Sequence, residues 1–230
     1  MSSIPFHQAD GSPALSAPEA ISQRRATRHF DPARPLPDEL LTQILHLTTL
    51  APSGNNLQPW RFLVVRTQAN REKLAACSFG QPKIGEAPVV VVVLGYHNPH
   101  QTHLEPMIQM QIEAGAITPE IGQGIRVRAP RSVENAPNRE VWVMRSTMLA
   151  AATLMIAAES LGVASAPMEG FELDKVKAVF GVPDDHTVCC LVAIGFASAE
   201  VERKPFPGRF GLEEVCYLEH FGGPWTLGDV

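Results

Sequence analysis

The stretch Pro88-Val89-Val90-Val91-Val92-Val93-Leu94 decides the fold of this chain. Neighbouring residues of a strand point to opposite sides of the sheet, so five consecutive valines leave the strand without a polar face. An apolar run of this kind is typical of a central strand that is covered on both faces. The sequence therefore predicts a sheet with a layer of other elements on each side.

Segments on both sides of this run predict further helices and strands. Helices are expected over 17–25, 37–50, 68–77, 104–113, 139–161 and 171–180, and strands over 60–66 and 187–196. Helix 139–161 is rich in alanine around much of its circumference, which predicts a buried helix and is compatible with a subunit interface.

Three segments show a weaker pattern, apart from the helix expected over 104–113. Residues 1–18 are expected to be a flexible tail. The Gly- and Pro-containing stretch 96–138, which includes Arg126, Arg128 and Arg131, is interpreted as a lid or excursion. Residues 200–230 carry many aromatic and aliphatic side chains but no core of their own, so they are expected to pack on a partner subunit.

Length, composition and charge restrict the class of protein. The 230 residues are 45% hydrophobic, which is enough for one large domain, here 19–230. The formal charge of -5 offers no general attraction to nucleic acid or to an anionic membrane. We expect a soluble, cytoplasmic protein, because no apolar window reaches the length of a membrane span and the N-terminus does not read as a secretory signal.

The cysteines and histidines do not indicate a metal site. Cys77, Cys189, Cys190 and Cys216 match no zinc or redox spacing, and a reducing compartment fits their use. His97, His100 and His103 recur every third residue, but Asn98-Pro99 is expected to prevent a helix there, so solvated loop histidines are predicted and no metal.

Three arginines lie close together in Arg24-Arg25-Ala26-Thr27-Arg28-His29-Phe30. A solvated basic face is the simpler interpretation. The functional interpretation is an anion clamp, because guanidinium groups donate paired hydrogen bonds that suit phosphate.

Two further segments have a structural and a functional interpretation. The stretch Pro52-Ser53-Gly54-Asn55-Asn56-Leu57-Gln58-Pro59-Trp60 is either a plain turn or a polar edge for a flat heterocycle. The stretch Pro167-Met168-Glu169-Gly170 is either a strand-to-helix turn or a place where a glycine lets a flat ligand approach the backbone. Arg209, ahead of Leu212-Glu213-Glu214, is by itself only a loop arginine.

Taken together and in this order, these segments resemble the FMN-dependent nitroreductase family. The most specific parts are Arg-Arg-x-x-Arg-x-Phe at 24–30 and Pro-Ser-x-x-Asn-x-Gln-Pro-Trp at 52–60, and the resemblance runs from about 21 to 217. It implies an α+β fold in which helices flank a central, mostly antiparallel mixed β-sheet, and an intertwined homodimer.

The resemblance also implies a set of FMN contacts. Arg24 and Arg209 would bind the phosphate, with neighbouring contacts from Arg25 and Ala26. Arg28 and Lys83, with Gln81 beside it, would stabilise negative charge at the pyrimidine end of the reduced flavin. Backbone contacts near flavin N5 would come from Pro167, Met168, Glu169 and Gly170, and contacts from the other subunit from Pro52, Ser53 and Asn56.

The implied reaction is ping-pong hydride transfer from NADH or NADPH through flavin N5 to a nitroaromatic, a quinone or a similar small acceptor. No side chain is assigned as a certain catalytic residue. Reductive dehalogenation, alkene reduction, oxidation of a small molecule and a non-enzymatic flavin sensor are the alternatives. One departure from the family is Pro207, where many relatives carry a basic residue, with Lys204 upstream as the possible replacement.

Overall fold

The computed structural model describes residues 6–201 and 206–226. Its sheet has four strands in the order β1-β2-β4-β3, and each neighbouring pair is antiparallel. The strands are β1 (Trp60–Val65), β2 (Val89–Tyr96), β3 (Ala164–Met168) and β4 (His186–Gly195). A single parallel bridge joins Ala26 to Ser165. The predicted α+β fold with a mostly antiparallel central sheet is confirmed.

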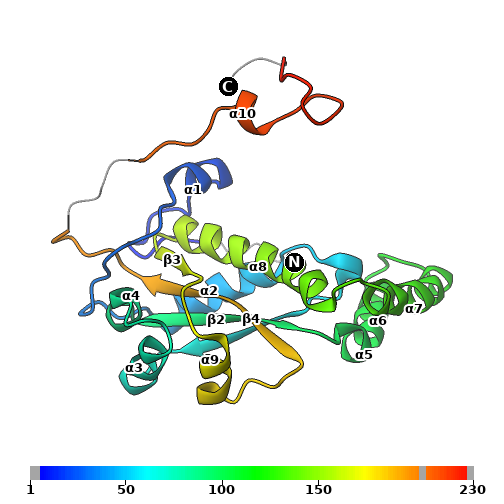
Figure 1. Cartoon of the computed structure of the whole chain (residues 1–230), viewed down its shortest axis with the longest axis horizontal. Helices are drawn as coiled ribbons and strands as arrows, with labels where there is room; N and C mark the ends of the chain where they lie inside the picture. The colour runs from blue at the N-terminus through cyan, green and yellow to red at the C-terminus, as the bar shows by residue number, and fades with distance from the viewer. Residues whose placement is uncertain (1–5, 202–205, 227–230) are drawn as a thin grey trace. The chain divides into compact units, whose positions relative to one another are not determined.

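The valine run of β2 lies at the centre of this sheet and is fully buried. Val89, Val91 and Val93 belong to the core cluster on one face, and Val90 and Val92 belong to the cluster on the other. The helices that flank the sheet are α2 (Asp38–Thr49) and α8 (Arg139–Ser160) on the first face, and α3 (Gln68–Ala76), α4 (Pro82–Glu86) and α9 (Leu173–Phe180) on the second. Figure 1 shows α8 on one side of the sheet and α3 and α9 on the other.

Helix α8 is the longest element. The side chain of Asn138 caps its first turn by accepting a hydrogen bond from Val141 N at 3.0 Å. By length and composition α8 could cross a membrane, a property that buried core helices share. Ala151, Leu154 and Ala158 pack it into the core between α2 and the sheet. The prediction of a buried helix over 139–161 therefore holds for this inward face.

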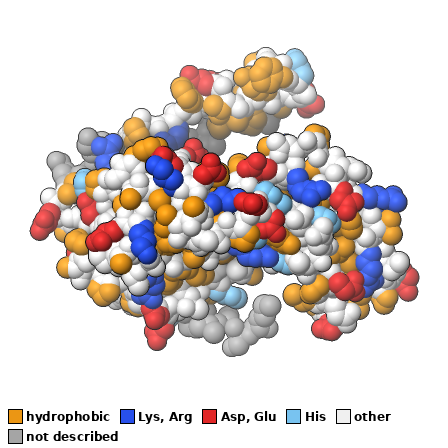
Figure 2. Space-filling model, turned by 60° about the horizontal axis from the view of Figure 1, so that its bottom comes forward, with side chains coloured by type: hydrophobic (Ala, Val, Ile, Leu, Met, Phe, Trp, Pro, Cys, Tyr) orange, Lys and Arg blue, Asp and Glu red, His pale blue; other side chains and the backbone are white. Residues whose placement is uncertain are grey.

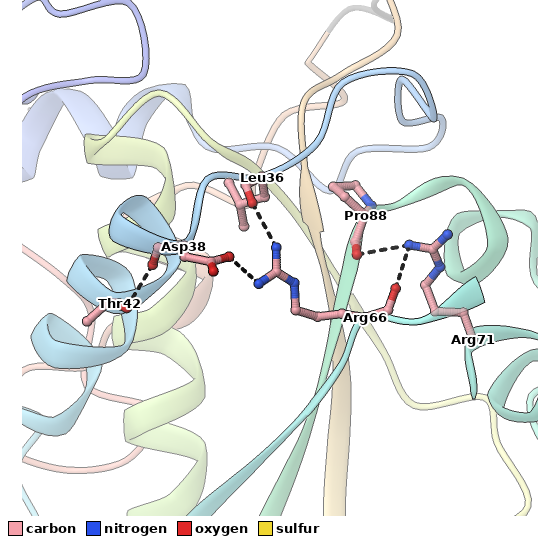
Figure 3. Close-up of polar contacts among 6 residues, drawn as sticks. All are labelled: Leu36, Asp38, Thr42, Arg66, Arg71 and Pro88. Atoms are coloured by element: carbon pink, nitrogen blue, oxygen red, sulfur yellow. Dashed lines mark hydrogen bonds and ion pairs between the residues drawn. The ribbon is translucent and has the colours of Figure 1, made fainter. Parts of the chain in front are cut away.

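Two arginines connect the end of β1 to its neighbours (Figure 3). The Arg66 guanidinium pairs with the Asp38 carboxylate and donates to the Leu36 carbonyl at 3.0 Å. Arg71 Nη1 donates to the carbonyl of Arg66 at 3.2 Å and to that of Pro88 at 2.9 Å. The beginning of the valine strand is thereby joined to β1, and β1 to α2.

The stretch 96–138 is expected from its sequence to lack regular structure after residue 113, but it contains a second long helix there. We call residues 96–138 the hairpin. It contains α5 (Pro99–Thr102), α6 (Leu104–Glu113) and α7 (Pro119–Glu134), at the right of Figure 1. The glycines of α7 and its internal Pro130 have low helix propensity, so the sequence does not predict this helix. A Cβ added at Gly122 would lie 3.0 Å from Ile108 Cγ2, so this glycine allows α6 and α7 to approach closely. Tertiary packing here outweighs propensity.

Residues 6–16 are anchored, although the sequence predicts a flexible tail over 1–18. Ala9 N donates to the Leu161 carbonyl at 3.0 Å, and Leu15 N donates to the Ser160 carbonyl at 2.9 Å. The last carbonyls of a helix lack partners within it, so this segment stabilises the end of α8. Phe6 packs against the same core, and α1 (Ala17–Gln23) follows. Residues 1–5 lie outside the described part.

The chain divides into two compact units at Ser198. In the second unit, α10 (Leu212–Val215) precedes a turn in which Tyr217 and Phe221 pack with ring centroids 4.5 Å apart. Phe210 and Phe221 are 75% and 88% exposed in the single chain. Exposed aromatic side chains of this kind are compatible with packing on a partner subunit, which stays a prediction.

Charge is distributed evenly over the face drawn in Figure 2, where acidic and basic side chains alternate. Such a face provides no broad positive field for a polyanion. A bound anion therefore needs a local group of donors.

The adjacent cysteines lie at an irregularity of the sheet. Val93 pairs with Cys190 and Leu94 with Val188, so Cys189 is the additional residue of a β-bulge. Both thiols are free, and burial raises the pKa of each to about 12. Cys190 is a small buried side chain, as the sequence predicts, whereas Cys189 is half-buried.

We expect Cys189 and Cys190 to resist iodoacetamide in the native protein. With a pKa of about 12 for both thiols, the thiolate fraction near pH 8.5 is roughly a thousandfold below that of a free cysteine. Peptide mass spectrometry after timed labelling measures this. The same thiols in guanidinium are the control, and the native rate should rise as the pH approaches 12. Equal labelling rates in the native and unfolded chain would contradict the buried assignment.

Candidate active site

The arginine motif begins where α1 ends. Ser16 N and Oγ both donate to the Glu19 carboxylate, at 2.8 and 2.6 Å, and this capping contact starts the helix. At Arg24 the chain turns into an extended conformation, and Thr27 N donates to the Ser165 carbonyl at 3.0 Å. The motif is thereby fixed along β3, the edge strand of the sheet.

Arg24 has the environment of an anion-binding residue. Its Nη1 is buried and has no hydrogen-bond partner within the described residues. A buried charged donor without an acceptor is costly, so such an atom is suited to bind a negatively charged ligand. Ser165 Oγ, on the strand beside the motif, is also buried without a partner among the described residues. An anionic group such as the phosphate of FMN fits the donor of Arg24.

The other basic residues of the motif differ from Arg24. Arg25 Nη1 donates to the carbonyls of Ser22 at 2.7 Å and Arg24 at 2.9 Å, so its guanidinium is turned back onto the end of α1. Ala26 forms the bridge to Ser165, and Arg28 is exposed.

Glu86, at the end of α4, binds the same motif from a distant part of the sequence. Its carboxylate accepts from Phe30 N at 3.0 Å and lies 3.2 Å from His29 Nδ1. This contact places α4, which carries the half-buried Lys83, beside the arginine motif. No sequence signal marks Glu86, because its partners lie more than fifty residues away.

The turn after β3 is joined to the beginning of α4. Gln81 Nε2 donates to the Gly170 carbonyl at 2.7 Å. Met168 is buried beneath this turn, whereas Pro167, Glu169 and Gly170 are exposed. A Cβ added at Gly170 would lie 3.3 Å from Gln81 Nε2, so the glycine permits this close contact. Three of the predicted groups, 24–28, 81–83 and 167–170, therefore lie around one edge of the sheet.

The polar loop (residues 52–58) lies elsewhere in the same chain. Gly54 N donates to Ser146 Oγ at 3.2 Å, near the beginning of α8. The segment leading to the arginine motif instead binds Ser160, at the end of α8. Ser146 and Ser160 are about 21 Å apart along the helix axis at the usual rise per residue. The loop precedes β1, and the arginine motif lies along β3 at the opposite edge of the sheet, so within one chain Pro52, Ser53 and Asn56 are not brought to the motif.

Arg209 belongs to the second unit of the chain. Its guanidinium donates to the Gly208 carbonyl at 2.7 Å and lies 4.8 Å from the centre of the Phe206 ring. Its predicted pairing with Arg24 on one phosphate stays a prediction. Lys204, the possible replacement for a basic residue at Pro207, lies outside the described residues.

The sequence predicts that the three histidines of the hairpin are solvated loop residues, and this prediction is wrong. Pro99 occupies the first turn of α5, where a missing N–H is tolerated, so it begins a helix instead of preventing one. His97 Nε2 lies 2.7 Å from Thr187 Oγ1, His100 is buried, and His103 Nδ1 lies 2.8 Å from the Leu57 carbonyl. Burial lowers the pKa of His97 and of His100. In the described ranges, no three His, Cys, Asp or Glu side chains gather as a metal site.

Comparisons with known proteins agree on one family. The family model described as "Nitroreductase family" matches residues 21–196. A protein named NADH dehydrogenase from Thermus thermophilus is 33% identical over 188 residues, which is 82% of this chain and 90% of that protein. A Haemophilus influenzae protein assigned as an NAD(P)H nitroreductase is 27% identical, over 86% of this chain and 93% of its own length.

Solved structures extend this likeness to the fold. A protein of Exiguobacterium sibiricum, assigned as a nitroreductase and solved in complex with FMN, superposes with a TM-score of 0.81 and 26% identity. The superposition covers 90% of this chain and 98% of that one. The motif order, the sheet with helices on both faces and the family model all lead to the same assignment. The chain belongs to the nitroreductase family of oxidoreductases.

Proposed function

We propose that this protein is an FMN-dependent oxidoreductase that takes electrons from NADH or NADPH and passes them to a small oxidised organic acceptor such as a nitroaromatic or a quinone. The observation that carries the proposal is the buried Nη1 of Arg24 beside the edge strand β3, which has no hydrogen-bond partner in the part of the chain that the structure describes. The FMN complex of the Exiguobacterium sibiricum relative and the NAD(P)H donor named for the Haemophilus influenzae relative support the cofactor and the donor.

In this proposal each group around the sheet edge has one task. Arg24, Arg25, Ala26 and, from the second unit, Arg209 bind the phosphate. When bound, FMN supplies the hydride-accepting and hydride-donating chemistry of a ping-pong reaction. Arg28 and Lys83 hold positive charge near the pyrimidine end, where reduction leaves negative charge. Gln81 and residues 167–170 form the wall beside the ring.

The complete site requires two chains. The polar loop precedes β1, whereas the arginine motif lies along β3 at the opposite edge of the four-stranded sheet, so one protomer does not bring the two to the same flavin. We infer a homodimer in which Pro52, Ser53 and Asn56 of one chain complete the site of the other. In this proposal residues 19–230 form one FMN-binding domain, in which the hairpin 96–138 covers the substrate side and the exposed aromatic residues of the extension 200–230 pack on the partner. A cytoplasmic enzyme of this kind needs no nucleic-acid or membrane partner.

The visible absorption spectrum of the purified protein tests this function. We expect oxidised-flavin bands, in the protein as isolated or after supply of FMN, that bleach when NADH or NADPH is added without oxygen and return when a nitroaromatic or a quinone follows. A protein that binds no FMN would overturn the proposal. Bound flavin that stays oxidised with both nicotinamides would favour a non-enzymatic flavin protein instead, and a halophenol or an activated alkene as the only effective acceptor would change the reaction class.

A further inference from the structure

The polar loop has a backbone that its own sequence does not favour. Asn55, Asn56 and Gln58 have φ angles of 51°, 54° and 47°, in the left-handed region that glycine occupies most readily. Asparagine tolerates this region better than most residues, but glutamine does not share that preference. Internal bonds support only part of the shape: Ser53 Oγ accepts from Gln58 N at 3.0 Å, and the Ser53 carbonyl accepts from Asn56 N at 3.0 Å. Contacts from outside the loop must hold the rest.

These outside contacts come from the helical hairpin and from α8. Leu57 is fully buried in the hairpin core with Leu104 and Val133. Asn55 Nδ2 donates to Ser132 Oγ on α7 at 2.7 Å. Gly54 packs closely on Trp142, because a Cβ added there would lie 3.1 Å from that ring. The loop is therefore attached to the hairpin at several points, while Asn56 stays exposed.

His103 is the polar centre of this attachment, and its contacts determine its tautomer. The Leu57 carbonyl, 2.8 Å from Nδ1, can only accept, so Nδ1 carries the hydrogen. The Arg61 Nη2, 2.6 Å from Nε2, can only donate, so Nε2 is the acceptor. The neutral ring thus connects β1 to the loop, with both nitrogens used. A phenyl ring would keep the shape of this side chain and lose both bonds.

The surroundings keep His103 and Arg61 in place. The Arg61 guanidinium lies 5.2 Å from the centre of the Tyr96 ring, and its Nη1 donates to the Trp60 carbonyl at 2.9 Å. The Tyr96 and His103 ring centroids are 6.1 Å apart. Arg61 and Tyr96 come from paired strands of the rigid sheet, whereas His103 comes from the hairpin, so the ring joins the two.

We propose that His103 is a positioning residue, which holds the polar loop in the shape that presents Ser53 and Asn56 to the flavin of the partner subunit. This inference rests on the proposed function, because it takes the loop to be a cofactor contact. It also makes the hairpin and the loop one mechanical unit, so that the segment covering the substrate side is joined to a segment that contacts the cofactor. His103 itself touches neither substrate nor flavin in this proposal.

The test compares His103→Phe with His103→Asn in the full-length protein. Asparagine places an amide nitrogen near the position of Nδ1 and keeps the donor to Leu57, whereas phenylalanine keeps only the ring. His97→Phe is the matched control, because His97 lies in the same segment but contacts Thr187 instead of the loop. The readouts are the FMN dissociation constant by fluorescence titration, the absorption bands of bound FMN, and amide hydrogen exchange over 53–58 in the protein without FMN.

We expect His103→Phe to raise the FMN dissociation constant about tenfold and to speed exchange over 53–58 by a similar factor, as loss of a buried hydrogen bond implies. His103→Asn should stay within about threefold of the wild type, and His97→Phe should match the wild type over 53–58. Unchanged affinity, spectrum and exchange in His103→Phe would overturn the inference. Equal weakening by Phe and Asn would also overturn it, since the donor to the Leu57 carbonyl, which asparagine keeps, would then not be what holds the loop.

A second pair of variants decides the matter if His103→Phe does not fold. Ser132→Ala removes the bond that α7 of the hairpin makes to the loop, from an exposed position, and Thr42→Ala removes a similar hydroxyl that bonds within α2. We expect Ser132→Ala to bind FMN about threefold more weakly than the wild type, and Thr42→Ala to bind FMN with the affinity of the wild type. Equal affinities in this pair would contradict attachment of the loop by the hairpin. A wild-type protein that binds no FMN is a separate result, which would remove the proposed function itself.

Discussion

Replacement of Arg24 by glutamine is expected to weaken FMN binding by roughly 10- to 150-fold, because a hydrogen bond to a charged group contributes about 1.5–3 kcal/mol. Arg24 Nη1 is buried without a partner in the described residues, so the wild-type chain already bears the cost of desolvating this group. Fluorescence titration of the protein with FMN measures the change. Glutamine keeps some of the length and polarity of the side chain and removes its charge, which reduces effects on folding.

Arg66→Gln is the control for this variant. Arg66 follows β1, at the edge of the sheet opposite the arginine motif, and pairs with Asp38 at the surface. Exposed ion pairs of this kind contribute about 0–1 kcal/mol to the free energy of unfolding. FMN affinity in Arg66→Gln should equal that of the wild type. If Arg24→Gln and Arg66→Gln bind FMN equally well, the arginine motif is a solvated basic face and the assignment of the phosphate site is wrong.

Replacement of Leu154 by alanine is expected to lower the free energy of unfolding by about 2–5 kcal/mol, the range for a leucine deleted from a close-packed core. Leu154 is 0% exposed and packs α8 against the valine strand and α2. In a chain of this size the loss corresponds to a fall in Tm of roughly 4–20 °C. Urea unfolding followed by circular dichroism measures the difference directly.

Leu50→Ala supplies the comparison. Leu50, at the end of α2, is 67% exposed in the single chain, so its truncation should change the free energy of unfolding by about 0.5 kcal/mol or less. Similar losses for the two variants would mean that the core does not lie between α8 and the sheet. A small loss for Leu154→Ala alone would indicate that the neighbouring side chains collapse into the space.

The sheet and its two layers of helices follow from local sequence patterns. The valine run Val89–Val93 alternates between two buried faces, because strand geometry leaves consecutive apolar residues no other choice. Helix signals at 37–50 and 139–161 match α2 and α8 closely for the same reason, since their periodicity and caps are local. The hairpin helix α7 escapes this reasoning because Gly122 and Pro130 are unfavourable in isolation and tolerated only in contact with α6.

The candidate site divides in the same way. The sequence by itself determined the central strand, the order of the motifs, the family and the residue types of the proposed phosphate site, because each depends on residues close together in the chain. Only the tertiary structure decided that Arg24 keeps a buried donor without a partner in the described residues, that Glu86 binds the motif from α4, and that His103 contacts the Leu57 carbonyl of the polar loop. These contacts join residues more than forty positions apart or depend on burial, and neither pairing over such distances nor exclusion of water is written in a local pattern.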